Sequence, residues 1–152
     1  MEKELAEKIK EIRSQIKDRL IVRNLSDDDW EVLLSWWDFW PGWKAPVKEF
    51  LPEDGKGGLM IEKNGIPIVA GFMYQTNSDV VIFEWVISNP KYKEDDRQEA
   101  IELLIKEAER TSRDWGYKQM FTVGRNKSLI DIHERLGWKI DNKQSYEITK
   151  NL

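Results

Sequence analysis

The chain contains no cysteine and only one histidine among its 152 residues. The absence of cysteine excludes a disulfide framework, a thiolate zinc site and a cysteine nucleophile. It also fits a reducing compartment, so we expect a cytoplasmic protein, and we expect no metal site.

Long apolar runs are also missing. No stretch approaches the roughly 20 apolar residues that cross a bilayer, and the Lys- and Glu-rich residues 1–20 lack the apolar core of a signal peptide. The 24 basic and 28 acidic side chains give a net charge of -4, the wrong sign for binding through phosphate neutralisation. The sequence therefore argues against membrane and nucleic-acid partners.

The length is typical of one domain, and we expect a single domain over residues 1–152. An amphipathic helix appended at residues 1–19 is predicted by apolar residues at spacings of four, three, four and four: Leu5, Ile9, Ile12, Ile16 and Leu20. Ser26 and the acids after it predict a second helix from near Asp27, which Pro41 ends at Trp40.

From residue 58 the pattern changes to short β-rich runs. Residues 59–63, 66–75 and 80–88 predict three consecutive antiparallel strands, joined by turns at Asn64–Gly65 and residues 77–79. A helix ending at Gly116, a strand over 118–123, a helix ending at Gly137 and a final strand in 138–140 or 145–150 complete the series. This order indicates an α/β (α+β) fold with a mixed sheet covered by helices.

Residues 126–138, NKSLIDIHERLGW, resemble the closing motif of the GNAT superfamily of N-acyltransferases. The match begins at Asn126 and ends in an apolar residue, a glycine and an aromatic: Leu136, Gly137 and Trp138. The resemblance covers residues 20 to 150 and implies a mainly antiparallel sheet flanked by helices. The tryptophan-rich region, with FLPEDG and EWVISNP, is also similar to small GNAT-like proteins encoded by bacteriophages, which would place the protein in a host cytoplasm.

The resemblance implies transfer of an acetyl or other acyl group from acyl-CoA to an amine. His133 takes the position of the family's tyrosine, which protonates the leaving thiolate, and an imidazolium could serve. The alternative is a buried ring that packs on an apolar face. Glu84 is the candidate base, although strand alternation also allows it to lie on a solvated face.

The cofactor-binding residues that the resemblance implies lie on the third predicted strand and beyond it: Val86, Ile87, Ser88, Arg97 and Asn126. Asn126 could equally be a helix cap. The family's pyrophosphate loop carries two glycines, and neither register of KYKEDDRQEAIELL supplies one. Because Glu94, Asp95, Asp96 and Glu99 crowd this helix start, we expect weak coenzyme A binding, a different acyl donor or none.

Five of the eight tryptophans lie between Trp30 and Trp43, more than one short helix needs for packing. We expect an acceptor pocket formed by Trp36, Trp40, Trp43 and Tyr74, which suits a small-molecule or protein amine. The alternative is core packing plus an oligomer contact, as in a homodimer. Two rival functions stay open: a GNAT-like fold without catalysis that acts in binding or regulation, and a phage enzyme that modifies a nucleobase amine.

Overall fold

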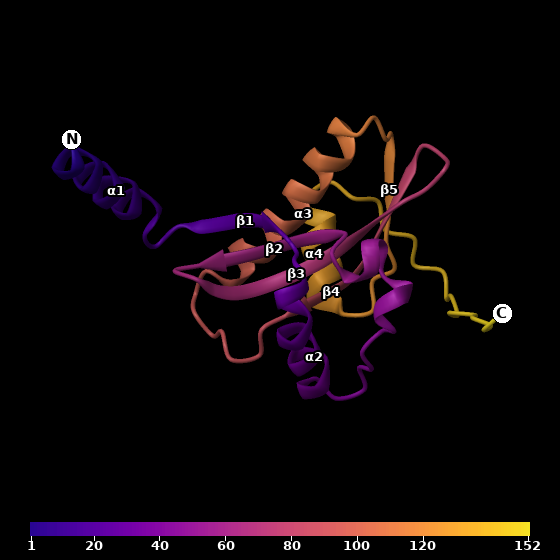
Figure 1. The fold of residues 1–152 in the computed structure, drawn as a ribbon. Coiled ribbons are helices and arrows are strands. Elements are labelled where there is room, and N and C mark those ends of the chain that lie inside the picture. Colours follow the sequence, from indigo (N-terminus) through magenta and orange to yellow (C-terminus); the bar gives the residue numbers. More distant parts are fainter.

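A computed structural model describes residues 1–152. Its centre is a five-stranded sheet in the order β1-β2-β3-β4-β5 (Figure 1). The strands are β1 (Leu20–Asn24), β2 (Gly58–Lys63), β3 (Ile66–Gln75), β4 (Val80–Ser88) and β5 (Gln119–Phe121). The first four pair antiparallel, and β5 pairs parallel to β4. This architecture confirms the predicted mixed, mainly antiparallel sheet.

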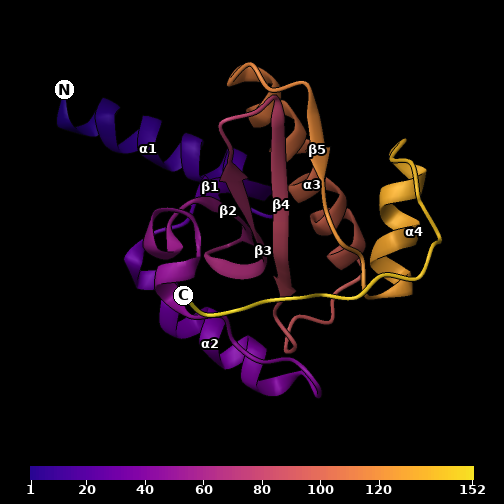
Figure 2. The same ribbon diagram turned by 90° about the vertical axis from the view of Figure 1, so that its right-hand side faces the viewer.

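Helices cover both faces of the sheet (Figure 2). One face carries α2 (Trp30–Phe39), and a core of nine buried residues forms there, with Trp37 and Phe72 at its centre. The other face carries α3 (Arg97–Asp114) and α4 (Lys127–Arg135), above a core of thirteen buried residues. The alternation of apolar side chains along β2 and β4 supplies both cores, as a sheet buried on two faces requires.

Local signals in the sequence set the helix ends. Ser26 and Asp29 form a reciprocal capping box over a 3-10 turn (Asp27–Asp29), from which α2 continues. Two further 3-10 turns, Lys48–Phe50 and Pro52–Gly55, follow α2 before β2 begins. Gly137 ends α4 with a φ of 95°, a conformation that a residue with a Cβ rarely adopts.

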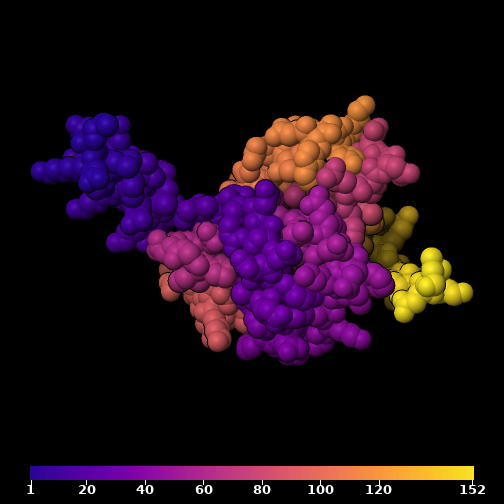
Figure 3. All heavy atoms as spheres, in the orientation of Figure 1, coloured from indigo at the N-terminus to yellow at the C-terminus, as the bar shows by residue number.

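The helix α1 (Glu2–Ile16) contributes no buried residue and projects from the body (Figures 1 and 3). Its predicted apolar stripe exists but stays exposed: Leu5 is 60% exposed and Ile12 is 56% exposed. No helix of the chain is both long and apolar enough to cross a membrane.

The structure differs from the predicted strands in two places. The apolar stretch Leu20–Val22 was not predicted as a strand, yet it begins β1, which forms the edge of the sheet beside β2. The predicted final strand is absent, because residues 138–152 have no regular structure and pair with no other strand. The period-2 pattern of residues 145–150 marks a segment able to pair, but pairing needs a neighbouring edge that this segment does not reach.

Candidate functional site

The chain makes an irregular turn in the middle of β4. The register places Phe72 opposite Glu84 but Ala70 opposite Ile87, so Trp85 and Val86 together face the single residue Gly71. This is a β-bulge, and Trp85 has a φ of 60°, which is rare for a bulky side chain. Strained backbone of this kind clusters at functional sites.

The bulge changes which side chains face which core. Before it, Val81 and Phe83 face the α3 layer; after it, Ile87 faces the α2 layer. Glu84 lies opposite Phe72, which belongs to the α2-side core, and Trp85 also packs against that core. Consecutive side chains therefore project to the same face, which simple alternation cannot predict.

Beside the bulge, β4 and β5 separate. Their pairing covers only Val80–Gln119, Val81–Met120 and Ile82–Phe121, so the β5-facing edge of β4 has no strand neighbour from residue 83 to 88. The Glu84 carboxylate bridges the opening: its Oε1 accepts the Val123 amide at 2.7 Å, and its Oε2 lies 3.6 Å from Arg125. The site is thus an open strand edge with one carboxylate at its mouth.

The far end of the opening holds Arg97, the first residue of α3. Its guanidinium donates to the Ser88 hydroxyl at 2.7 Å and lies 5.6 Å from the centre of the Trp40 ring. Trp40 in turn donates from Nε1 to the Ser88 carbonyl at 3.1 Å. Of the predicted cofactor-binding residues, Ser88 and Arg97 are therefore in contact.

The first turn of α3 keeps free donors despite its acids. Asp96 precedes the helix, but its carboxylate accepts from Lys63 at 2.9 Å and Tyr92 at 2.6 Å and does not cap the helix. These two partners hold the pKa of Asp96 below its usual value, and the hydrogen bond from the Tyr92 hydroxyl has the larger effect. Uncapped amides at a helix start favour an anion, whereas exposed Glu94 and Asp95 oppose one.

The predicted acceptor residues separate into two groups. Trp36 lies in the core with 4% exposure, whereas Trp40 is half-buried and Trp43 is 41% exposed. The Tyr74 hydroxyl accepts from Trp85 Nε1 at 3.0 Å and donates to the Phe50 carbonyl at 3.1 Å. Burial raises the pKa of Tyr74, so its hydroxyl keeps its proton at neutral pH. Trp85 and Arg125 were not among the site residues predicted from the sequence, because no local pattern distinguishes either residue.

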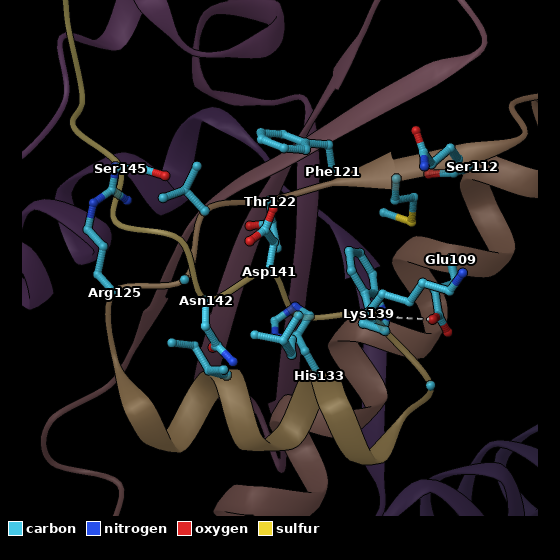
Figure 4. Close-up of a pocket in the computed structure, with 18 of the residues that line it drawn as sticks. Glu109, Ser112, Phe121, Thr122, Arg125, His133, Lys139, Asp141, Asn142 and Ser145 are labelled. Atoms are coloured by element: carbon cyan, nitrogen blue, oxygen red, sulfur yellow. Dashed lines mark hydrogen bonds between the residues drawn. The ribbon is translucent and has the colours of Figure 1, made fainter.

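His133 lies elsewhere. It lines a cavity on the outer side of β5, which Glu84 does not line (Figure 4). Its Nδ1 is 2.8 Å from the Leu129 carbonyl, so Nδ1 carries the proton, and its Nε2 has no partner. Burial lowers the pKa of His133, which leaves the ring neutral at neutral pH, with a lone pair on Nε2. Donation to a thiolate from this atom requires the ring to gain a proton first.

Asn126 caps α4 by accepting the Leu129 amide at 3.3 Å. The cap occupies its oxygen and leaves its Nδ2 donors free, so the two roles weighed for this residue are compatible.

The lowered pKa of His133 gives a prediction about stability. The unfolded chain binds the proton near the ordinary pKa of about 6.5, more tightly than the folded chain does. The contribution of the neutral ring to the free energy of unfolding is therefore fully present above the unfolded pKa. It is lost as the pH falls through the folded pKa. Urea unfolding should show that the native chain has a lower free energy of unfolding at about pH 5 than at about pH 7, by at most about 1.4 kcal/mol per pH unit. His133→Phe should not show this loss. Equal losses in the two proteins would contradict this assignment.

Comparison with known proteins supports the fold. No family model and no curated protein matches the chain. Among solved structures it resembles aminoglycoside acetyltransferase AAC(6')-Iy bound to a bisubstrate analogue of coenzyme A, with a TM-score of 0.60, 16% identity and coverage of 88% of this chain and 99% of that chain. A GCN5-related N-acetyltransferase from Ralstonia eutropha JMP134 matches with a TM-score of 0.61 and 17% identity, over 86% of this chain and 99% of that chain. N-acetylglutamate synthase from Neisseria gonorrhoeae, solved with coenzyme A and N-acetyl-glutamate, matches with a TM-score of 0.63 and 13% identity. The match covers 77% of this chain and 28% of that chain. The chain thus has the fold of GNAT acetyltransferases.

Proposed function

We infer that this chain transfers an acetyl or other acyl group from an acyl-CoA to an amine. The observation that supports this function is the bulge at Trp85–Val86 beside the separation of β4 from β5, which leaves a strand edge open to a ligand. The structures with this fold include complexes with coenzyme A or its analogue.

The residues of this site fit such a donor in part. The free edge of β4 at Val86 and Ile87 offers backbone groups to an extended chain and to a thioester carbonyl, whereas the Ser88 carbonyl already accepts from Trp40. The uncapped first turn of α3 and Arg97 offer donors to phosphate. The missing glycines and the nearby acids make this end of the site weaker than its counterpart in the family.

Acyl-CoA, when bound, supplies the acyl group as a thioester. Glu84 then accepts a proton from the ammonium group of the acceptor, which frees the nitrogen lone pair to attack the thioester carbonyl. The new C–N bond replaces the C–S bond, the nitrogen gives up a second proton to solvent as the amide forms, and the sulfur leaves as a thiolate that takes up one proton from solvent. Neutral His133 is not a ready source for that proton, so its role as the acid depends on prior protonation.

The acceptor lies on the α2 side in this proposal, because Glu84 and Trp85 project there. Tyr74 is bonded to Trp85 there, and Trp40 packs against the same core. Such rings stack on a cationic amine, a sugar or a nucleobase, so an aminated small molecule, a protein amine and a nucleobase amine are the acceptor classes to test.

Titration with acetyl-CoA tests the proposal directly. Millimolar acetyl-CoA should raise the melting temperature, because a ligand of the native state stabilises it. Arg97→Ala should weaken binding about tenfold, equivalent to about 1.4 kcal/mol, as expected when a charged hydrogen bond is lost. Arg113→Ala removes the same side chain from the last turn of α3 and serves as the matched control. Equal weakening by both variants would show that general charge accounts for the binding.

The second candidate is a binding or regulatory protein without catalysis. The observation that favours it is the glycine-free first turn of α3, with Glu94 and Asp95 exposed beside it. Residues 89–96 give no second observation for it: Asn89 donates to the Pro67 carbonyl and Lys63 donates to Asp96, which ties this segment to β3 and β2. No response to acetyl-CoA in calorimetry would select this second candidate.

A further inference from the structure

The exposed stripe of α1 has the spacing of a coiled-coil seam. Its members follow one another at intervals of four, three and four residues, which are alternating d and a positions of two heptads: Leu5, Ile9, Ile12 and Ile16. All four lie within α1 and are 41% to 60% exposed. A helix of 15 residues is marginal in water when it stands alone, so α1 needs a partner that covers this stripe.

The junction between α1 and the body has a defined geometry. Lys17 ends the helix in an extended conformation, and Asp18 follows in the left-handed region with a φ of 62°. The Asp18 amide donates to Asn64 Oδ1 at 2.9 Å, and Asn64 Nδ2 donates to Asp18 Oδ1 at 3.0 Å. This reciprocal pair ties the corner to the turn between β2 and β3, and α1 points away from the sheet (Figure 1). The stripe is therefore presented to another molecule.

The charges of α1 favour a protein partner over a lipid surface. The helix carries four acidic and four basic side chains: Glu2, Glu4, Glu7, Glu11, Lys3, Lys8, Lys10 and Arg13. Helices that lie on membranes are rich in Lys and Arg on their polar face, which attracts anionic headgroups. A balanced set gives no such attraction. A second copy of α1, by contrast, presents the same apolar seam, and a two-fold axis makes two such seams complementary.

The charges beside the stripe set the direction of pairing. In a parallel pair, each g position faces the e position five residues further along the other helix, so Lys8 would meet Arg13 on both sides of the seam. These like charges repel. In an antiparallel pair, Lys8 lies beside Gln15, and Arg13 lies beside Ala6. Only the antiparallel direction therefore avoids a repulsive contact.

The antiparallel direction also suits the stripe and the two bodies. Leu5 of each helix lies opposite Ile16 of the other, and Ile9 lies opposite Ile12, so each d position meets an a position in every layer. Each body follows the C-terminal end of its own α1. The two bodies therefore lie at opposite ends of a helix pair about 22 Å long and do not compete for space.

We propose that α1 of one chain pairs with α1 of a second copy in an antiparallel two-helix coiled coil. The pairing is reciprocal and closes at two chains. Because α1 leads into β1, at the edge of the sheet opposite β5, both β4–β5 openings lie at the far edge of their sheets and stay free. The dimer forms independently of acyl transfer.

Sedimentation velocity of the full chain tests the assembly. The native chain should be a dimer that dissociates on dilution, and Ile12→Asp should raise its dissociation constant by at least about tenfold, because a charge enters the apolar seam. Ser14→Asp adds the same charge on the opposite side of the helix and should leave the dimer intact. Near-UV circular dichroism should be unchanged in both variants, because α1 carries no aromatic residue and contributes none to the core.

A monomeric native chain would overturn the proposal, as would a dimer that Ile12→Asp does not weaken. A monomer that binds vesicles of phosphatidylcholine and phosphatidylserine would assign the stripe to a membrane and would also overturn it.

Disulfide cross-linking tests the direction, since the chain has no native cysteine. Leu5→Cys chains mixed with Ile16→Cys chains should form a mixed disulfide dimer on oxidation. Leu5→Cys chains alone should not cross-link, because the two sites lie about 16 Å apart along the antiparallel pair, beyond the reach of a disulfide. Ser14→Cys is the control for chance collision and should stay reduced. Cross-linking of Leu5→Cys chains alone, or equal cross-linking of Ser14→Cys chains, would refute the antiparallel pair.

Discussion

Glu84→Gln is expected to lower the rate of acyl transfer by about 100-fold or more, since a positioned general base contributes about that much. Glutamine keeps an oxygen that can accept the Val123 amide, now 2.7 Å from Glu84 Oε1, so the bridge between β4 and β5 survives. Acetyl-CoA affinity should change less than about threefold, because the substitution leaves the edge of β4 and Arg97 untouched. Thiol release with a panel of amines measures the first quantity, and calorimetry measures the second.

The matched control is Glu147→Gln. Arg125 pairs with both carboxylates, at 3.6 Å from Glu84 and 2.7 Å from Glu147, so this variant removes an Arg125 partner without touching the opening. Transfer should be unchanged. If Glu84→Gln retains full activity, Glu84 only joins β4 to the segment after β5 and is not the base. If both variants lose activity, transfer depends on the position of Arg125 and not on proton transfer to Glu84.

Arg23→Met is expected to destabilise the fold by about 2–3 kcal/mol, at the low end for a buried ion pair, because Asp29 is buried but the Arg23 side chain is 34% exposed. Asp29 is only 5% exposed, and both of its oxygens accept from the Arg23 guanidinium at 2.8 Å. Arg23 also donates to Glu62 at 2.8 Å, so it joins β1, β2 and the start of α2. These bonds to Arg23 lower the pKa of Asp29, and the substitution leaves a carboxylate buried without its counter-charge.

Urea unfolding at neutral pH measures this loss. Arg110→Met is the matched control, because its partners Glu107 and Asp114 lie on an exposed helix surface, where such pairs contribute less than about 1 kcal/mol. The double variant Arg23→Met with Asp29→Asn should recover part of the stability, because it removes the uncompensated charge. A loss for Arg23→Met no larger than that for Arg110→Met would show that water replaces the guanidinium.

Local pattern predicted much of this fold. The boundaries of β3 and β4 were predicted correctly, and the face of α3 that is buried, with Ala100, Leu104, Ile105, Ala108 and Ser112, matches its helical spacing. These features depend on interactions between near neighbours in sequence, so the residues themselves encode them. The failures were β1 and the final strand, both of which depend on whether a distant edge is available to pair.

The same limit applies to the tryptophans and to Glu84. Trp36 was expected in an acceptor pocket, but it is buried in α2 together with Leu33 and Trp37. Alternation could not decide the face of Glu84, because the bulge adds a residue to β4 at Trp85 and resets the period.

The sequence by itself determined the helices, the three central strands, the resemblance at residues 126–138 and the absence of glycine at the start of α3. It did so because helical and strand periodicity and turn chemistry are local. Tertiary structure alone decided where β4 and β5 part, that Glu84 closes that gap, and that His133 faces a different cavity as a neutral ring. Those properties arise from strand register, burial and contacts between residues far apart in the chain, and no short stretch of sequence specifies them.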